Sequence, residues 1–299
     1  MRIGSRRSVV LLLLLASAAA AASSDKTFDR QAPAQPRGVV EISNVTGSIE
    51  VSGWDRSEVS VHADLDSGVE RVELVSDGPR TSIKVILPHA SSHGGEARLQ
   101  VKIPKDSELD VSAVNADLTT TGVLGVQHLS AVSGNIAAEL AGADVELKTV
   151  SGDLHLKGHG QPARLHVSTV SGEIHLEHGA GELEASTVNG TLIVSLDSAR
   201  EVRARSTSGD VRFEGKLTRG ASFEASTVSG DLNIRASADG GYAYEVSSFS
   251  GDITDCFNVS PEPVSKYGPG SRLQGTRGEG AGHVRLKTMS GDIQLCDRS

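Results

Sequence analysis

A short motif recurs along most of the chain, and it constrains the fold more than any other feature of the sequence. The motif has the form Thr-Val-Ser-Gly-Asp plus an apolar residue, and it returns every 18 to 21 residues before a final step of 40. Its glycines are Gly134, Gly152, Gly172, Gly190, Gly209, Gly230, Gly251 and Gly291. Repetition at such a period is typical of stacked architectures, because a short unit buries its apolar side only against its neighbours. The motif therefore predicts a solenoid.

When positions are numbered from the motif glycine, positions −7, −5, −2, +2 and +4 are mostly apolar. This alternation is typical of strands with one buried side, and its shift between −5 and −2 indicates a bend or bulge. We therefore predict an all-β chain, a single-stranded parallel β-helix (β-solenoid) with coils of about 18–21 residues and a less regular N-terminal β region. A meander of antiparallel hairpins is the alternative. The β-helix is favoured because equivalent residues recur at equal intervals and not in mirrored pairs.

The two ends of the chain differ from the repeats. An arginine-containing start, a short apolar run and an alanine-rich stretch predict a cleaved export signal, with a retained N-terminal anchor as the alternative. The predicted segments are a signal peptide (1–22), a flexible leader (23–37), an N-terminal β region or cap (38–108), and solenoid repeats (109–299) with a loop excursion at 258–282. We therefore expect an exported protein, either periplasmic or extracellular.

Composition and charge narrow the range of partners. Aromatic residues are 3% of the chain, and the formal charge of −9 becomes −12 once the three arginines of the signal are removed. An acidic chain poor in aromatic residues is unsuited to nucleic acid and is repelled by anionic lipid surfaces. We expect no nucleic-acid partner and no stable membrane insertion. The predicted partner is an envelope protein or a glycan.

Stacked coils align equivalent positions into columns, and two of these columns carry possible cation ligands. Position +1 is mostly acidic, and calcium takes carboxylate oxygens. A tight turn also explains the Ser-Gly-Asp motif, because glycine adopts positive φ and the Ser and Asp side chains form hydrogen bonds with nearby backbone N–H groups. We favour this interpretation over a cation site. His155 and His175 share position +3 and are weak candidates for a transition-metal site. Both are expected on the outward side, so no metal site and no cofactor are predicted.

No nucleophile and base are arranged in a catalytic pattern. The serines belong to a repeat, and the chain has neither a G-x-S-x-G elbow nor a phosphate-binding glycine loop. The motif threonines, such as Thr169, Thr187 and Thr227, are expected on a solvated strand face. The sequence therefore predicts no catalytic residue, and we do not expect an enzyme.

The two cysteines of the chain occupy the same position of their units. Cys256 and Cys296 both lie at +5, and the proline- and glycine-rich segment 258–282 between them has no strand alternation. If that segment is a loop, the cysteines lie in adjacent coils at a separation that suits a disulfide. An exported chain enters an oxidising compartment, so we predict the bridge Cys256–Cys296.

The order of motifs resembles that of a known family. The chain opens with G-x-V-x-I-x-N-V-x-G at 38–47, continues with SGWDRSEV at 52–59 and VKIP at 101–104, and ends in the serial repeats. This order is similar to that of the DUF4097 family of adhesin-type β-strand repeat proteins, over about residues 38–299. The resemblance implies a β-solenoid in the bacterial envelope, without established catalytic residues.

Together these features predict an exported, non-enzymatic scaffold or binding protein of the bacterial cell envelope, adhesin-like or related to envelope stress. The alternatives are a carbohydrate-active β-helix enzyme and a cation-dependent binding module.

Overall fold

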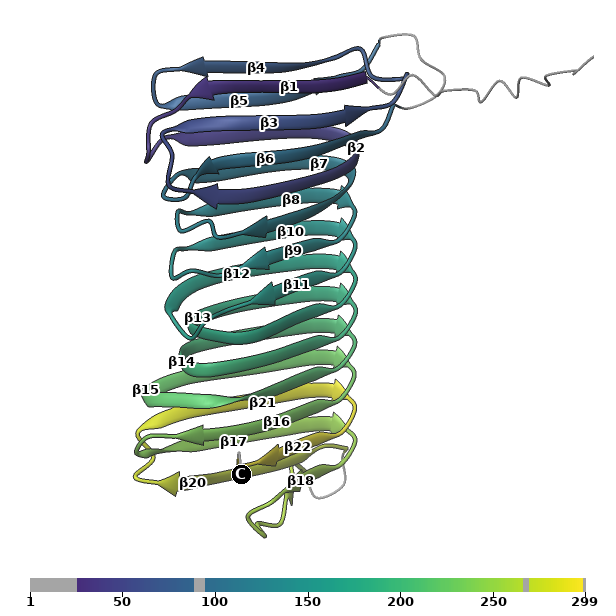
Figure 1. The fold of residues 1–299 in the computed structure, drawn as a ribbon. Coiled ribbons are helices and arrows are strands. Elements are labelled where there is room, and N and C mark those ends of the chain that lie inside the picture. Colours follow the sequence, from purple (N-terminus) through teal and green to yellow (C-terminus); the bar gives the residue numbers. More distant parts are fainter. Residues whose placement is uncertain (1–25, 89–94, 266–268, 298–299) are drawn as a thin grey trace, which may run out of the picture.

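The computed structural model describes residues 26–88, 95–265 and 269–297, so the predicted signal peptide at 1–22 lies outside the described residues. These residues form a long column of stacked strands (Figure 1). The strands belong to one mixed sheet around a continuous apolar core. The described part of the chain contains no helix, and so none that could cross a membrane.

The strands fall into three groups along the chain. The N-terminal group is β1 (Lys26–Pro33), β2 (Val39–Trp54), β3 (Glu58–Leu65), β4 (Arg71–Asp77), β5 (Arg80–Ile86) and β6 (Ala97–Pro104). The repeat group is β7 (Glu108–Thr121), β8 (Gln127–Ser133), β9 (Ile136–Glu139), β10 (Val145–Ser151), β11 (Leu154–Lys157), β12 (Pro162–Ser171), β13 (Ile174–Asn189), β14 (Leu192–Ser208), β15 (Val211–Ser229) and β16 (Leu232–Ala238). The C-terminal group is β17 (Gly241–Ser250), β18 (Ile253–Asp255), β19 (Glu262–Pro263), β20 (Ser271–Gly278), β21 (Gly282–Ser290) and β22 (Ile293–Cys296).

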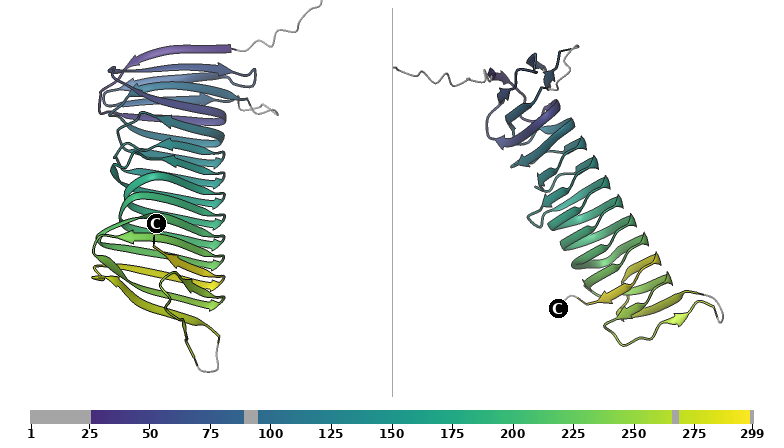
Figure 2. Two further views of the ribbon diagram at one scale, coloured as in Figure 1. Left: turned by 60° about the horizontal axis from the view of Figure 1, so that its bottom comes forward. Right: turned by 90° about the vertical axis from the view of Figure 1, so that its right-hand side faces the viewer.

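Equivalent residues of neighbouring repeats lie beside one another in the middle of the column. We call one motif turn, with the strand segments before and after it, a rung. Ser151 pairs with Ser133 on one side and with Ser171 on the other, and all three strands run parallel. Figure 2 shows the rungs stacked along the column from two further sides. The parallel, in-register stacking of the repeats in this part excludes the antiparallel meander.

The two ends of the column are built differently, so the sheet as a whole is mixed. β1, β3 and β6 pair antiparallel, as do β4 and β5 at the N-terminal end and β17 and β20 at the other. A uniform parallel helix is therefore not what the whole chain forms. The predicted flexible leader at 23–37 contains β1, which pairs with β3 over its full length. Its side chains are mostly exposed, so backbone pairing orders it without an apolar pattern in the sequence.

The rungs at the C-terminal end do not follow sequence order. β15 pairs with β21, and β21 pairs with β17; likewise β22 lies between β16 and β18. The last rung of the sequence is thus inserted between the two rungs that precede it. The predicted loop at 258–282 contains β20, which runs antiparallel along β17 and returns the chain toward the insertion.

The alternation of inward and outward residues continues up to the motif turn. Positions −7, −5 and −3 face the core, whereas −2 and −1 both face outward. The prediction of a bend or bulge between positions −5 and −2 is therefore wrong. The residues at −2 form an exposed column, which we call the valine stripe: Val114, Val132, Val150, Val170, Val188, Thr207, Val228, Met289 and Phe249 in spatial order. The inward residue is the motif threonine or serine, because an unbroken strand reverses sides at every residue.

Candidate binding surfaces

The motif turns are held together by a ladder of hydrogen bonds between rungs. The Oδ1 atom of Asp153 accepts a hydrogen bond from the backbone N–H of Glu173 at 2.8 Å, and the N–H of Asp153 donates to Oδ1 of Asn135 at 2.9 Å. Similar bonds link Asp117 to Asn135, Asp210 to Asp231, Asp231 to Asp292, and Asp292 to Asp252. This set at position +1, which we call the acidic column, supports the turn interpretation of the Ser-Gly-Asp motif.

The motif hydroxyls lie inside the column and not on a solvated face. Thr227 Oγ1 donates to the carbonyl oxygen of Gly209 at 3.2 Å, and Thr288 Oγ1 donates to that of Gly230 at 3.4 Å. The expectation of an exposed threonine face is therefore wrong. A buried hydroxyl is tolerated at this position because a glycine carbonyl of the adjacent rung is within reach. The hydroxyl groups of Thr149 and Thr187 are buried without a hydrogen-bond partner among the described residues.

His155 and His175 do come together, on the outward side of adjacent strands β11 and β13. Their ring centroids are 6.0 Å apart, and Nε2 of His175 lies 3.2 Å from Oε1 of Glu177. Among the described residues, no group of three or more His, Cys, Asp or Glu side chains is arranged to hold a metal ion. The pair forms part of a groove wall.

An open groove of about 410 Å³ runs over β7, β9, β11 and β13 beside this histidine pair. Small side chains form part of its lining, among them Thr119 and Ala137 at the position that His155 occupies one rung further on. Charged side chains from three rungs stand in it: Glu139, Lys157 and Glu177. A second hollow of about 490 Å³ shares His175 and Glu177 and continues toward Arg235. The two form one elongated face, which we call the groove face.

Both carboxylate oxygens of Glu139, on the groove face, have a polar contact. Its Oε1 lies 2.8 Å from Nε2 of His159, and its Oε2 accepts the backbone N–H of Gly122 at 2.9 Å. The hydrogen bond with His159 and the bond from Gly122 hold the pKa of Glu139 below its ordinary value. The carboxylate is therefore ionised at neutral pH, and it suits binding or accepting a hydrogen bond, not donating a proton.

No sequence motif marks Glu139, Lys157 and Glu177 as residues of a binding surface. Their shared position, +5, is the only signal that links them, and it becomes meaningful once β9, β11 and β13 are known to be adjacent. Cys256 and Cys296 occupy the same position further along the column.

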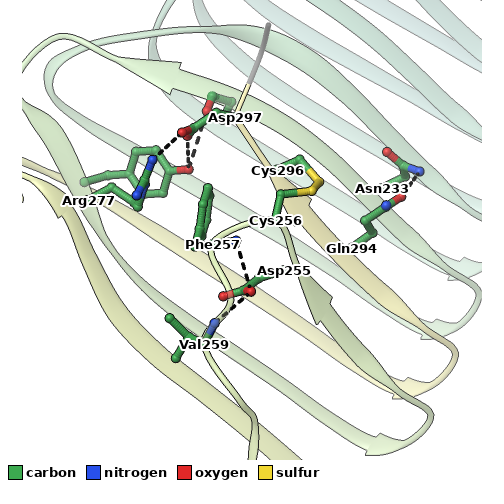
Figure 3. Close-up of a disulfide and its surroundings, with 11 residues drawn as sticks. Asn233, Asp255, Cys256, Phe257, Val259, Arg277, Gln294, Cys296 and Asp297 are labelled. Carbon is green, nitrogen blue, oxygen red and sulfur yellow. Dashed lines mark hydrogen bonds and ion pairs between the residues drawn. A yellow bond between two sulfur atoms is a disulfide. The ribbon is translucent and has the colours of Figure 1, made fainter.

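Cys256 directly follows β18, and Cys296 is the last residue of the adjacent strand β22. The two cysteines are joined as a disulfide (Figure 3). Their Cα atoms are 4.9 Å apart. Beside the bridge, Oδ1 of Asp255 accepts the backbone N–H groups of Phe257 and Val259 at 3.1 Å each. The bridge therefore connects the inserted rung to the start of the excursion.

A second contact near the bridge fixes the end of the chain. Asp297 accepts hydrogen bonds from Arg277 at 2.6 Å and from the hydroxyl of Tyr242 at 3.3 Å. Burial raises the pKa of Tyr242, with Asp297 adding to the effect, so this phenol stays neutral. The guanidinium of Arg277 also lies 4.2 Å from the ring centroid of Phe257. These contacts are structural, and no pattern in the sequence indicates them.

The fold and its surfaces define an all-β, solenoid-like repeat protein with long columns of equivalent residues. The family model described as Toastrack DUF4097 matches residues 39–296, and the chain belongs to that family. No curated protein matches the chain. The resemblance inferred from the motif order is thereby confirmed.

The solved structures that the chain resembles share little sequence with it. A "putative lipid binding protein" from Parabacteroides distasonis is 11% identical with a TM-score of 0.51, covering 90% of this chain and 96% of that one. A "putative adhesin" from the same organism is also 11% identical, with a TM-score of 0.45 and coverage of 92% and 98%. Only the first of these likenesses, with a TM-score of 0.51, bears on this chain, and at 11% identity it concerns the fold alone.

Proposed function

We propose that the chain is an exported, non-enzymatic scaffold of the bacterial envelope that binds an envelope glycan or protein along its groove face, in an adhesin-like role. The groove face is the observation that carries this proposal. It spans several rungs and combines small, apolar and charged side chains. An elongated partner suits it, because equivalent contacts recur at each rung.

We propose further that the column has the regular geometry of a β-helix. The repeats form a parallel β-helix with coils of 18 to 21 residues, and the antiparallel strands at the two ends serve as caps. Capping of this kind protects the open edges of a solenoid from further pairing. Export is supported by the disulfide and by the predicted signal, since disulfides persist in oxidising compartments.

The test is a glycan array and a cross-linking pull-down from the envelope fraction, with residues 23–299 oxidised. We expect capture that is lost in the double variant His155→Ala/His175→Ala. The control is His128→Ala/His166→Ala, which removes two outward histidines from β8 and β12, away from the groove face. Equal loss in both variants, or no specific capture by the unaltered protein, would contradict the proposal.

A second candidate is a carbohydrate-active enzyme, favoured by the two carboxylates in one groove. The backbones of Glu139 and Glu177 lie two strand spacings apart, or about 10 Å, compared with about 6.5–9.5 Å between the carboxyl groups of inverting glycosidases. The lowered pKa of Glu139 disfavours it as a general acid. Turnover of an acidic polysaccharide that stops in Glu177→Gln would support this candidate over pure binding, whereas a panel without turnover would remove it.

A further inference from the structure

The valine stripe is an apolar surface that the proposed function does not use. Its eight apolar members are between 42% and 59% exposed, and they include six valines. The column runs over nine successive rungs, so it is about 40 Å long at the usual spacing of strands. Because these side chains face outward beside the motif turn, burial in the core does not explain why valine recurs there.

The columns on either side of the stripe carry different charges. Position −4 contains no acidic residue in these nine rungs, and its basic members are Lys148, Arg205 and Lys287, with serine elsewhere. Position +1, across the turn, is the acidic column and contains no basic residue. The serines at −1 lie between the stripe and the acidic column. Lys148 and Arg205 also pair with Glu146 and Glu184 at position −6, so the positive charge of this flank is partly neutralised. The stripe is thus an uncharged band with an acidic flank on one side and a serine-rich, weakly positive flank on the other.

We propose that the valine stripe is the interface of a parallel homodimer. A second copy lies against it with the two-fold axis along the stripe, so that each rung faces the same rung of its partner. This symmetry sets the acidic column of each copy opposite the basic flank of the other. A two-fold axis across the stripe would instead set acidic column against acidic column, which costs energy. The charges therefore select the parallel arrangement.

The area available suits a second copy of the chain. Eight half-exposed apolar side chains and the adjoining serines offer on the order of 800 Å² per copy, as much as one partner gives to a standard interface. An isologous interface needs a self-complementary patch, and a regular column of like residues is one. A bilayer suits the surface less well, because the exported chain is acidic and the stripe has no tryptophan or tyrosine at its border.

The first test is the mass of residues 23–299 in solution, measured by sedimentation velocity over a wide concentration range. We expect a dimer whose dissociation constant rises about a hundredfold or more in Val150→Ser/Val170→Ser/Val188→Ser. The matched control is Val75→Ser/Leu124→Ser/Val264→Ser, which removes three exposed apolar side chains outside the stripe and should leave the dimer intact. Circular dichroism checks that both variants are folded. A monomer at every concentration overturns the proposal, including a monomer that floats with neutral vesicles.

The second test is the register of the two copies. Val150 and Val228 lie two rungs to either side of Val188, the middle residue of the valine stripe, and each is replaced by cysteine in a separate variant. In the parallel dimer each variant forms a disulfide-linked dimer with itself under mild oxidation. Cross-linking only in a mixture of the two variants would show the antiparallel arrangement and overturn the proposed symmetry.

Discussion

Because the motif glycine has no Cβ atom, two neighbouring rungs can approach closely at the turn. Gly190 has a φ of +156°, and a Cβ atom at this position would overlap the carbonyl oxygen of Gly172 in the adjacent rung. Two independent constraints, the backbone angle and the close approach, therefore act on the same residue. This explains why glycine is repeated although the residues around it vary.

We predict that Gly190→Ala lowers the free energy of unfolding by about 3 kcal/mol or more, because both the angle and the contact must be relieved. The measurement is urea denaturation. Gly78→Ala is the control, since Gly78 has a φ of +59° and open space around the added Cβ. It should cost about 1 kcal/mol. Equal effects of the two substitutions would show that contact between the rungs is unimportant.

The acidic column gives a second prediction at this scale. Asp153→Ala removes the acceptor for the N–H of Glu173 and should lower the free energy of unfolding by about 1–2 kcal/mol. Asp153→Asn keeps an oxygen acceptor, as Asn135 does one rung earlier, and should be close to the unaltered protein in thermal denaturation. If Asp153→Asn lowered stability as much as Asp153→Ala, and calcium raised the Tm of the unaltered protein, the acidic column would act through its charge and not through its hydrogen bonds.

At the scale of strands, the notable element is the inserted rung of β21 and β22. Its two neighbours, β15–β16 and β17–β18, are joined to each other in sequence but separated by this rung in space. The connection from β16 to β17 must therefore leave room for one rung. The disulfide ties β22 to the end of β18, on the side where the column terminates.

We predict that Cys256→Ser/Cys296→Ser, or reduction, destabilises this end of the column selectively. The bridge closes a segment of 40 residues, and chain entropy sets an upper estimate of about 4 kcal/mol for its contribution. Hydrogen exchange should accelerate in β17, β18 and β20, while β10 to β14 stay protected, because a solenoid rung contacts only its neighbours. Uniform acceleration along the chain would contradict this local role.

The whole molecule is a stack in which most rungs are interchangeable but the last ones are not. Deletion of residues 173–190 would join Gly172 to Thr191 and remove one rung without changing the register of its neighbours. Deletion of residues 279–299 removes the inserted rung and leaves β17–β18 without its parallel partner. The two deletions are similar in length and differ in their effect on contacts.

We predict that the internal deletion folds with a modest loss of stability, whereas the C-terminal deletion leaves residues 241–278 open to proteolysis. Limited proteolysis with mass spectrometry and urea denaturation measure the difference. The physical reason is that a sequential rung can be replaced by the next one. Among the described strands that remain after the C-terminal deletion, by contrast, none is free to fill the gap left by β21 and β22. An intact 241–278 segment after the C-terminal deletion would contradict the insertion.

Much of the structure follows from short-range patterns in the sequence. Alternation determines that residues at −7, −5, +2 and +4 face the core, and the motif glycine determines where each strand turns. The equal spacing determines that equivalent residues stack, as Ser151 does between Ser133 and Ser171. These properties depend on neighbours within one unit or on the repeat itself, so the chain encodes them locally.

Tertiary structure decided what local patterns leave open. Every rung presents a similar edge, so the sequence does not specify that β21 pairs between β15 and β17. The apolar residues at position −2 are expected to face the core, but the strand keeps its alternation and places the threonine at −3 inside. The hydroxyl group of that threonine donates a hydrogen bond to a glycine carbonyl of the adjacent rung, as Thr227 does. The groove face likewise exists only because separate repeats bring Glu139, Lys157 and Glu177 together. Pairing between distant segments is set by the packing of the whole column, and no local pattern records it.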